Sequence, residues 1–308
     1  MTSRPAVGRA TKPATPGIGT RTLVFALVRE DGTVDAGELY AIAEALGMTD
    51  QQVRLCLKRL VAEGRFTQEG RGRKAVLRAT ADATGAIAPD VQYVRHAYRQ
   101  DQGLAPWDEV WHLFAFAIPE TARQARDTLR DTLLHLGAAP VQGGLYVSAN
   151  AIGDIVEAHA RQLDVLPSLT RLTSRDLRVG DETDPVRLAA LLWPLQKIAD
   201  RHEALAALAT SRLARLSGAD QPTSTERLTY AIELAAAFTT AMDPDPLLPP
   251  ELLPQPWPGT RARAVAAQCW EALAAESGQD HGRPHLFRLY DGAIRTPASP
   301  STPLPSRP

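Results

Sequence analysis

The 308-residue chain is long enough for about two or three domains, and 44% of its residues are hydrophobic, so it can bury a sizeable core. It has no apolar run of about 18 residues, which excludes a membrane-spanning helix, and its N-terminal residues lack the apolar segment of a signal peptide. Cys56 and Cys269 have no Cys-x-x-Cys neighbour, which argues against a disulfide framework or a cysteine zinc site. We therefore expect a cytoplasmic protein whose two cysteines are small buried hydrophobic residues.

The net charge of −1 conceals an uneven distribution along the chain. Residues 1–80 carry 13 Lys/Arg and 8 Asp/Glu, a balance of +5, whereas the rest of the chain balances at −6. Such asymmetry suggests that one part of a chain meets an anion. An ordinary solvated surface explains the excess of basic residues about as well. The arrangement of these residues must therefore distinguish an anion-binding surface from an ordinary one.

Residues 20–80 predict three helices followed by a basic hairpin. Asp35 and Thr49 are suitable N-caps for the second and third helix, and Gly47 and Gly64 are suitable stops. The expected helices cover residues 20–30, 36–47 and 49–63. Two short strands follow, "RFTQ" and "AVLRAT", joined by "EGRGRK". This order is typical of a winged helix-turn-helix.

Residues 105–183 predict a ferredoxin-like domain with the order β-α-β-β-α-β. Its first strand, "VWHLFAFAI", is apolar almost throughout, which suits a central strand buried on both faces. The elements expected are a strand at 110–118, a helix at 119–137, two short strands around Gly143–Gly144, a helix at 152–163 and a strand at 169–179.

Residues 184–291 predict a helical C-terminal domain, because long stretches carry apolar residues at helical spacing. Within it, "DPDPLLPPELLPQPWPG" at 243–259 is too rich in proline to be helical throughout and predicts a rigid connector. Residues 81–104 predict a linking helix. The ends of the chain, 1–19 and 292–308, lack apolar periodicity and predict a disordered arm and a disordered tail.

The outer face of the third helix has the chemistry of a DNA-reading surface. Projection at 100° per residue places Val53, Cys56, Leu57, Leu60 and Val61 on the side that can be buried. The opposite side carries Gln51, Arg54, Leu55, Lys58 and Arg59. Arg and Lys can donate to guanine, and Gln can pair with adenine in the major groove. Leu55 could touch a thymine methyl or another protein.

The hairpin tip alternates Arg71, Arg73 and Lys74 with glycines that permit a tight turn. A wing of this kind can hold cations against DNA phosphates, contacts that set register and affinity without reading sequence. The alternative is a charged, solvent-exposed turn. The preceding helix favours the DNA-binding interpretation.

Four stretches carry a resemblance to a known family. They are "VRLCLKRLVAEGRFTQEGRGRKAVLRAT", "PWDEVWHLFAFAIPE" with "RDTLRDTLLHLGAAPVQGGLYVSAN", "LLWPLQKIADRHEAL" and "DPLLPPELLPQPWPG". Over residues 18–280 the chain resembles the PaaX family of bacterial transcriptional repressors, whose founding members control phenylacetate catabolism. The resemblance implies a homodimeric DNA-binding regulator. It also implies a small-molecule effector, with phenylacetyl-CoA the best-known example.

The chain departs from the family pattern in places that bear on the effector. The wing ends Val76-Leu77-Arg78-Ala79-Thr80 without the tyrosine of the family's Tyr-x-Leu-Thr pattern. Pro194 stands where the family usually has Asp, and His202 stands where a Tyr is expected. These departures leave the DNA-binding prediction in place and weaken the transfer of a particular effector.

The motifs of several enzyme classes are missing from the sequence. It has no GxSxG, HExxH, GxxxxGK[ST] or GxGxxG motif. The strand order of the middle domain is, however, also similar to that of small CRISPR-associated nucleases. Such nucleases need an acidic metal ligand at the end of the first strand, but here Glu120 lies inside the following helix, and a lone carboxylate cannot assemble the metal. Arg123, Arg126 and Arg130 could meet a CoA phosphate, although pairing with neighbouring aspartates is the more ordinary role. We expect no enzyme activity, no metal and no cofactor.

The sequence therefore predicts an α+β protein that acts as a dimeric, sequence-specific repressor on double-stranded DNA, released by a small-molecule effector such as an aryl-acetyl-CoA. The residues expected to contact DNA are Thr49, Gln51, Gln52, Arg54, Leu55, Lys58, Arg59, Arg71, Arg73 and Lys74. The alternative is a ligand-sensing or protein-interaction module whose winged helix no longer reads DNA. Mg²⁺-dependent nuclease activity is a third hypothesis.

Overall fold

A computed structural model describes residues 18–80, 91–275, 284 and 290. Its N-terminal unit contains three helices and a small antiparallel sheet of strand order β1-β3-β2. The helices are α1 (Thr20–Ala26), α2 (Ala36–Ala45) and α3 (Asp50–Ala62). The strands are β1 (Thr33–Asp35), β2 (Phe66–Glu69) and β3 (Val76–Ala79), with a 3-10 turn, η1 (Gly72–Lys74), between the last two.

The predicted caps are present, but two details of this unit were not foreseen. Asp35 accepts a hydrogen bond from the Glu38 N–H and begins α2 as expected. Strand β1 has only three residues, too few to show the alternation of apolar and polar residues that marks a strand in a sequence. It is a strand because its backbone pairs with β3. The prediction that Val61 is buried is wrong, since it is 36% exposed while Leu60 is fully buried.

The central strand-containing domain has the predicted β-α-β-β-α-β order. Its antiparallel sheet has strand order β5-β6-β4-β7, which is the ferredoxin-like arrangement. The strands are β4 (Trp111–Phe116), β5 (Ala139–Gln142), β6 (Leu145–Ser148) and β7 (Leu169–Ser174). The helices are α5 (Arg123–His135), preceded by the 3-10 turn η3 (Glu120–Ala122), and α6 (Gly153–Gln162). A further turn, η4 (Leu166–Ser168), leads into β7.

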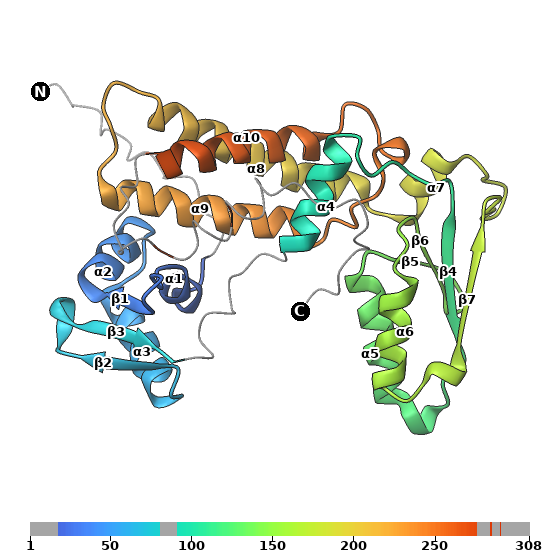
Figure 1. The fold of residues 1–308 in the computed structure, drawn as a ribbon, viewed down its shortest axis with the longest axis horizontal. Helices are drawn as coiled ribbons and strands as arrows, with labels where there is room; N and C mark the ends of the chain where they lie inside the picture. The colour runs from blue at the N-terminus through green and yellow to red at the C-terminus, as the bar shows by residue number, and fades with distance from the viewer. Residues whose placement is uncertain (1–17, 81–90, 276–283, 285–289, 291–308) are drawn as a thin grey trace, which may run out of the picture.

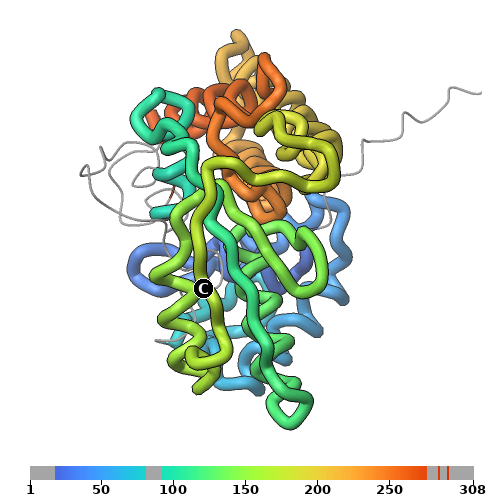
Figure 2. Tube along the Cα trace, turned by 90° about the vertical axis from the view of Figure 1, so that its right-hand side faces the viewer, coloured from blue at the N-terminus to red at the C-terminus, as the bar shows by residue number. Residues whose placement is uncertain are grey.

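Strand β4 is buried on both faces, as its continuous apolar run predicted. Phe114 is fully buried with Leu129 of α5 and Val156 of α6. Trp111 and Leu113 lie on the other face, in a second core that includes residues of the C-terminal region. In Figure 1 the two helices cover the face of the sheet that is turned toward the rest of the molecule, and Figure 2 looks onto the opposite face. The sheet therefore joins two cores.

The C-terminal region is helical, with one break inside a stretch of helical periodicity. Pro194 has no N–H and disfavours helix in the residue before it, and Trp193 is accordingly extended with φ −116° and ψ 145°. The break separates α7 from the long helix α8. The elements are α7 (Pro185–Leu192), α8 (Leu195–Leu216), α9 (Ser224–Met242), the 3-10 turn η5 (Pro250–Leu252) and α10 (Pro258–Ala275).

The N-terminal unit packs on α9, at the opposite end of the molecule from the central domain (Figure 1). Leu39 of α2 and Phe238 of α9 belong to one continuous buried cluster. Helix α4 (Val91–Asp101) packs into the same cluster through Val94 and Ala97. Beyond α10, Tyr290 stacks on Trp270 with ring centroids 4.3 Å apart. The N-terminal unit is thus held by the C-terminal helices through buried apolar surface.

Four sequence predictions lie wholly or partly outside the described residues. These are the disordered arm at 1–19, the first part of the linking helix at 81–104, the end of the helical domain at 184–291 and the tail at 292–308. Helix α4 lies within the predicted linking helix. Of the helices in the described ranges, none has the length and apolar character needed to cross a membrane.

Candidate nucleic-acid interface

Helix α3 begins with a reciprocal pair of cap hydrogen bonds. The Gln52 N–H donates to Thr49 Oγ1 at 3.2 Å, and the Thr49 N–H donates to Gln52 Oε1 at 2.8 Å. This capping box satisfies two backbone donors and fixes where the helix starts. Both side chains were predicted to contact DNA, and both have a local structural role at the exposed first turn of the helix.

The rest of α3 divides into a buried and an exposed face. Val53, Leu57 and Leu60 are buried in the core of the N-terminal unit, which fixes the rotation of the helix. Leu55, in the middle of the opposite face, is 50% exposed. The other exposed residues of the outer face are Gln51, Gln52, Arg54, Lys58 and Arg59.

The hairpin tip is folded back onto α2. Gly70 and Gly72 have φ of 84° and 62°, a left-handed conformation that glycine adopts readily and that permits the predicted tight turn. The Ala36 N–H donates to the Ala75 carbonyl at 3.0 Å, and a Cβ on Gly37 would lie 3.0 Å from the Arg73 carbonyl oxygen. The absence of a side chain at Gly37 therefore lets the tip approach α2 closely.

Arg73 of this tip is bound to the first turn of α3. Its Nη2 lies 3.3 Å and 3.4 Å from the two carboxylate oxygens of Asp50, and its guanidinium carbon lies 5.4 Å from the centroid of the Tyr40 ring. Both ends of the ion pair are about half exposed. Neither Asp50 nor Tyr40 was predicted to be part of this site, although Asp50 directly follows the predicted cap residue Thr49 in the sequence.

The remaining predicted cations are differently placed. Within the described ranges, no ion pair involves any of Arg54, Lys58, Arg59, Arg71 or Lys74, and all five side chains are exposed. Exposed cations that form no ion pair in this part of the chain are available to an external anion. The structure thus brings the predicted helix and wing cations together on one unit, with Arg73 already engaged.

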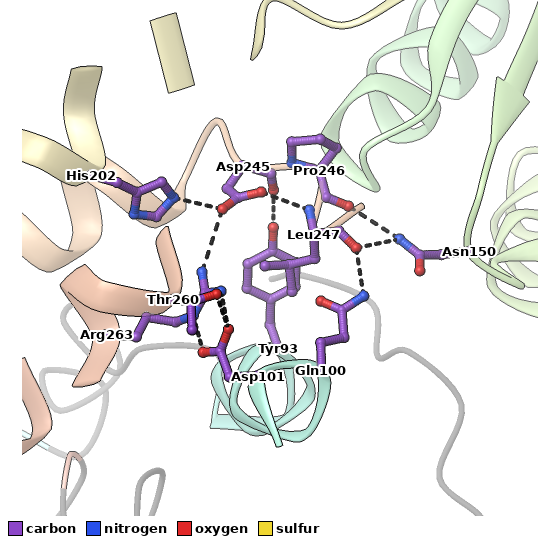
Figure 3. A network of polar contacts seen from close by, with 10 residues as sticks. All are labelled: Tyr93, Gln100, Asp101, Asn150, His202, Asp245, Pro246, Leu247, Thr260 and Arg263. Carbon is purple, nitrogen blue, oxygen red and sulfur yellow. Dashed lines mark hydrogen bonds and ion pairs between the residues drawn. The ribbon is translucent and has the colours of Figure 1, made fainter. Parts of the chain in front are cut away.

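A second polar cluster lies where the connector, residues 243–259, meets α4, α8 and α10 (Figure 3). Asp245 is 5% exposed, and its carboxylate accepts from the Leu247 N–H at 2.8 Å and lies 2.7 Å from His202 Nε2. Arg263 Nη1 is 3.7 Å away, and the Tyr93 hydroxyl donates to the Asp245 carbonyl. Burial would raise the pKa of Asp245, but the His202 bond and the Arg263 charge hold it below its ordinary value.

The same cluster ties α4 to α10. Arg263 makes a bidentate pair with Asp101, with distances of 2.6 Å and 2.7 Å, and Thr260 Oγ1 donates to the same carboxylate at 2.8 Å. Burial opposes the charge on Arg263, but the Asp101 bond and charge raise its pKa above the ordinary value. Helix α4 is therefore fixed to the C-terminal helices by charge as well as by apolar packing.

The central domain is attached to the same connector. Asn150 Nδ2 donates to the carbonyls of Pro246 and Leu247 at 3.1 Å and 3.0 Å, and Gln100 donates to the Leu247 carbonyl at 2.8 Å (Figure 3). A Cβ on Gly137 would lie 2.8 Å from the Pro246 Cα. The proline-rich connector therefore contacts α4, the central domain and the C-terminal helices.

The arginines of α5 are occupied by neighbouring carboxylates. Arg126 donates to Glu120 at 2.8 Å, and Arg130 pairs with Asp131 at 3.0 Å. Arg123 lies 3.6 Å from Asp127. The ordinary pairing considered in the sequence analysis is therefore present, and Glu120 serves as a partner of Arg123 and Arg126.

Comparisons with known proteins identify the family. Residues 20–83 match the model described as PaaX-like protein, residues 104–186 that of the PaaX protein central Cas2-like domain, and residues 193–282 that of the PaaX-like protein C-terminal domain. No curated protein matches the chain. Among solved structures, the uncharacterized protein Rv0674 from Mycobacterium tuberculosis is 21% identical, with a TM-score of 0.42, and the match covers 77% of this chain and 89% of that one. Because three successive family models span most of its length, the chain belongs to the PaaX family.

Proposed function

We propose that the protein is a sequence-specific transcriptional regulator whose residues 20–80 form a winged helix-turn-helix. In this proposal α3 is the recognition helix and the β2–β3 hairpin is the wing. The observation that carries it is the set of exposed cations on α3, next to the wing cations, on a helix whose other face is buried. Among the residues that the structure describes, these α3 cations form no ion pair. Family membership supports a role in transcription, because the name-giving members regulate phenylacetic acid catabolism.

Arg54, Lys58 and Gln51 would read base edges, while Arg71 and Lys74 would contact phosphates. Two copies of the chain would place two recognition helices about 34 Å apart on a roughly palindromic operator. A small molecule, of which an aryl-acetyl-CoA is one candidate, would release the DNA by binding the unbound state more tightly. Repression is the sign of regulation that the family resemblance favours.

The test is a pair of substitutions with different expected signatures. Arg54→Ala should reduce the preference for the operator over scrambled DNA by about 1–3 kcal/mol, because a base contact is lost. Lys74→Ala should weaken binding to both DNAs and reduce the salt slope by about 1, because a phosphate contact is lost. Arg201→Ala, which removes an exposed arginine of α8, is the control. An unchanged site preference for Arg54→Ala would contradict the assignment of α3.

Leu55 favours a second candidate function. An exposed leucine in the middle of the outer face of α3 also suits a protein contact, as in a sensing or interaction module that does not read DNA. Leu55→Ala separates the two. A loss of discrimination at an adenine–thymine pair supports a thymine-methyl contact, whereas unchanged DNA binding together with loss of self-association supports the protein contact.

A further inference from the structure

One wing cation differs from the others in its surroundings. Arg73 contacts both carboxylate oxygens of Asp50, at 3.3 Å and 3.4 Å, and lies over the ring of Tyr40. Among the described residues, Arg71 and Lys74, its neighbours in the wing, form no such ion pair. Arg73 is therefore held against the first turn of α3 in the absence of DNA.

The backbone around Arg73 is placed by α2. The hydrogen bond from Ala36 to the Ala75 carbonyl fixes one side of the turn, and the close approach at Gly37 fixes the Arg73 carbonyl. Tyr40 is buried, so its ring is a fixed platform for the guanidinium. A fixed backbone and a fixed platform direct the Arg73 side chain to Asp50.

Asp50 also occupies a position that DNA would approach. In a helix-turn-helix the N-terminal residues of the recognition helix contact the base edges. A carboxylate there stabilises the helix terminus but repels phosphate. A carboxylate and a phosphate are both acceptors for a bidentate guanidinium, so Asp50 and the DNA backbone compete for Arg73.

We propose that Asp50 restrains the wing by sequestering Arg73, and so lowers the affinity of the protein for DNA of any sequence. This inference rests on the proposed DNA-binding function. The loss of one phosphate contact weakens binding to the operator and to random DNA by about the same factor, because a phosphate contact carries no sequence information. Asp50 thereby sets the affinity of the protein for DNA without contacting a base.

The test uses the full chain and a double-mutant cycle. Asp50→Asn keeps the size of the side chain and leaves the Thr49 cap in place. Affinity for a random-sequence duplex is measured by fluorescence anisotropy at about 50 mM salt for wild type, Asp50→Asn, Arg73→Gln and the double variant. Glu63→Gln is the matched control, because Glu63 is a carboxylate at the other end of α3, about equally exposed and paired with Arg21 at 2.8 Å.

Asp50→Asn should bind random DNA about 3- to 10-fold more tightly than wild type. In the Arg73→Gln background the same substitution should raise the affinity by less than about 2-fold. Glu63→Gln should change the affinity by less than about 2-fold. Equal gains from Asp50→Asn with and without Arg73 would overturn the inference, because net charge alone would then explain them. An unchanged or weaker affinity for Asp50→Asn would also overturn it. If wild type bound no DNA, the proposed function itself would fail, and this inference with it.

Discussion

The substitution Asp245→Asn tests whether the buried polar cluster holds the parts of the chain together. The change keeps the shape of the side chain and one carbonyl oxygen, which can still accept from the Leu247 N–H. The other carboxylate oxygen lies 2.7 Å from His202 Nε2 and 3.7 Å from Arg263 Nη1. Depending on the orientation of the asparagine side chain, its position is taken by the amide nitrogen or by the neutral carbonyl oxygen. The charge that faces His202 and Arg263 is lost in either orientation.

A charge-assisted hydrogen bond contributes about 1.5–3 kcal/mol, and breaking a buried ion pair costs about 3–5 kcal/mol. Arg263 keeps its bidentate partner Asp101, which reduces the second cost. We therefore expect Asp245→Asn to lower the free energy of unfolding by about 2–4 kcal/mol, a large share of the about 5–15 kcal/mol typical of a domain.

Equilibrium unfolding in urea, followed by circular dichroism, measures this loss. Asp200→Asn, the same change at an exposed position of α8, is the control and should stay within about 0.5 kcal/mol of wild type. The double variant with His202→Gln should lose less than the sum of the single variants, because the two residues share one contact. A loss below about 0.5 kcal/mol for Asp245→Asn would refute the view that this cluster stabilises the fold.

Three further predictions follow from named contacts. Burial and the charge of Arg99 lower the pKa of His96 from 6.5 to about 4. Between pH 6.5 and about pH 4 the unfolded state therefore binds more protons than the folded state. The free energy of unfolding should fall by up to about 3 kcal/mol as the pH drops through this window. Denaturation at several pH values should show a weaker pH dependence for His96→Gln than for wild type. Gly137 and Gly144 have nearly equal φ of 85° and 88°, but only a Cβ on Gly137 would collide with the connector backbone. Gly137→Ala should therefore lower the melting temperature more than Gly144→Ala, and equal effects would argue against close docking of the central domain. Leu60→Ala should cost about 2–5 kcal/mol in urea unfolding because Leu60 is fully buried, whereas Leu55→Ala should be nearly neutral for stability.

Local features of the fold could be predicted from the sequence because their determinants are neighbours along the chain. Asp35 and Thr49 cap helices whose first N–H groups lie three residues away. The apolar run of β4 predicted burial on both faces without knowledge of what covers them. The outer and inner faces of α3 followed from helical periodicity, except that Val61 lies at the exposed edge.

Features made by distant residues could not be predicted in this way. Asp50 and Arg73 are 23 residues apart, and Asn150 meets the Leu247 carbonyl across 97 residues. Nothing in the local sequence pattern links such pairs. The Pro/Leu-rich connector was recognisable as a family signature, but the contacts that explain it come from α4, α8, α10 and the central domain, which only the folded chain brings together.

The central claim is that residues 20–80 read DNA, and the most direct test is binding of the full chain to the DNA upstream of its own gene. Fluorescence anisotropy would compare this DNA with a scrambled duplex at about 50 mM and about 200 mM salt, with and without phenylacetyl-CoA. We expect tight binding to the native DNA, weaker binding to the scrambled DNA, loss of affinity at the higher salt and release by the acyl-CoA if it is the effector. Equal and weak binding to both duplexes, followed by failure to enrich any sequence from random DNA, would contradict the account.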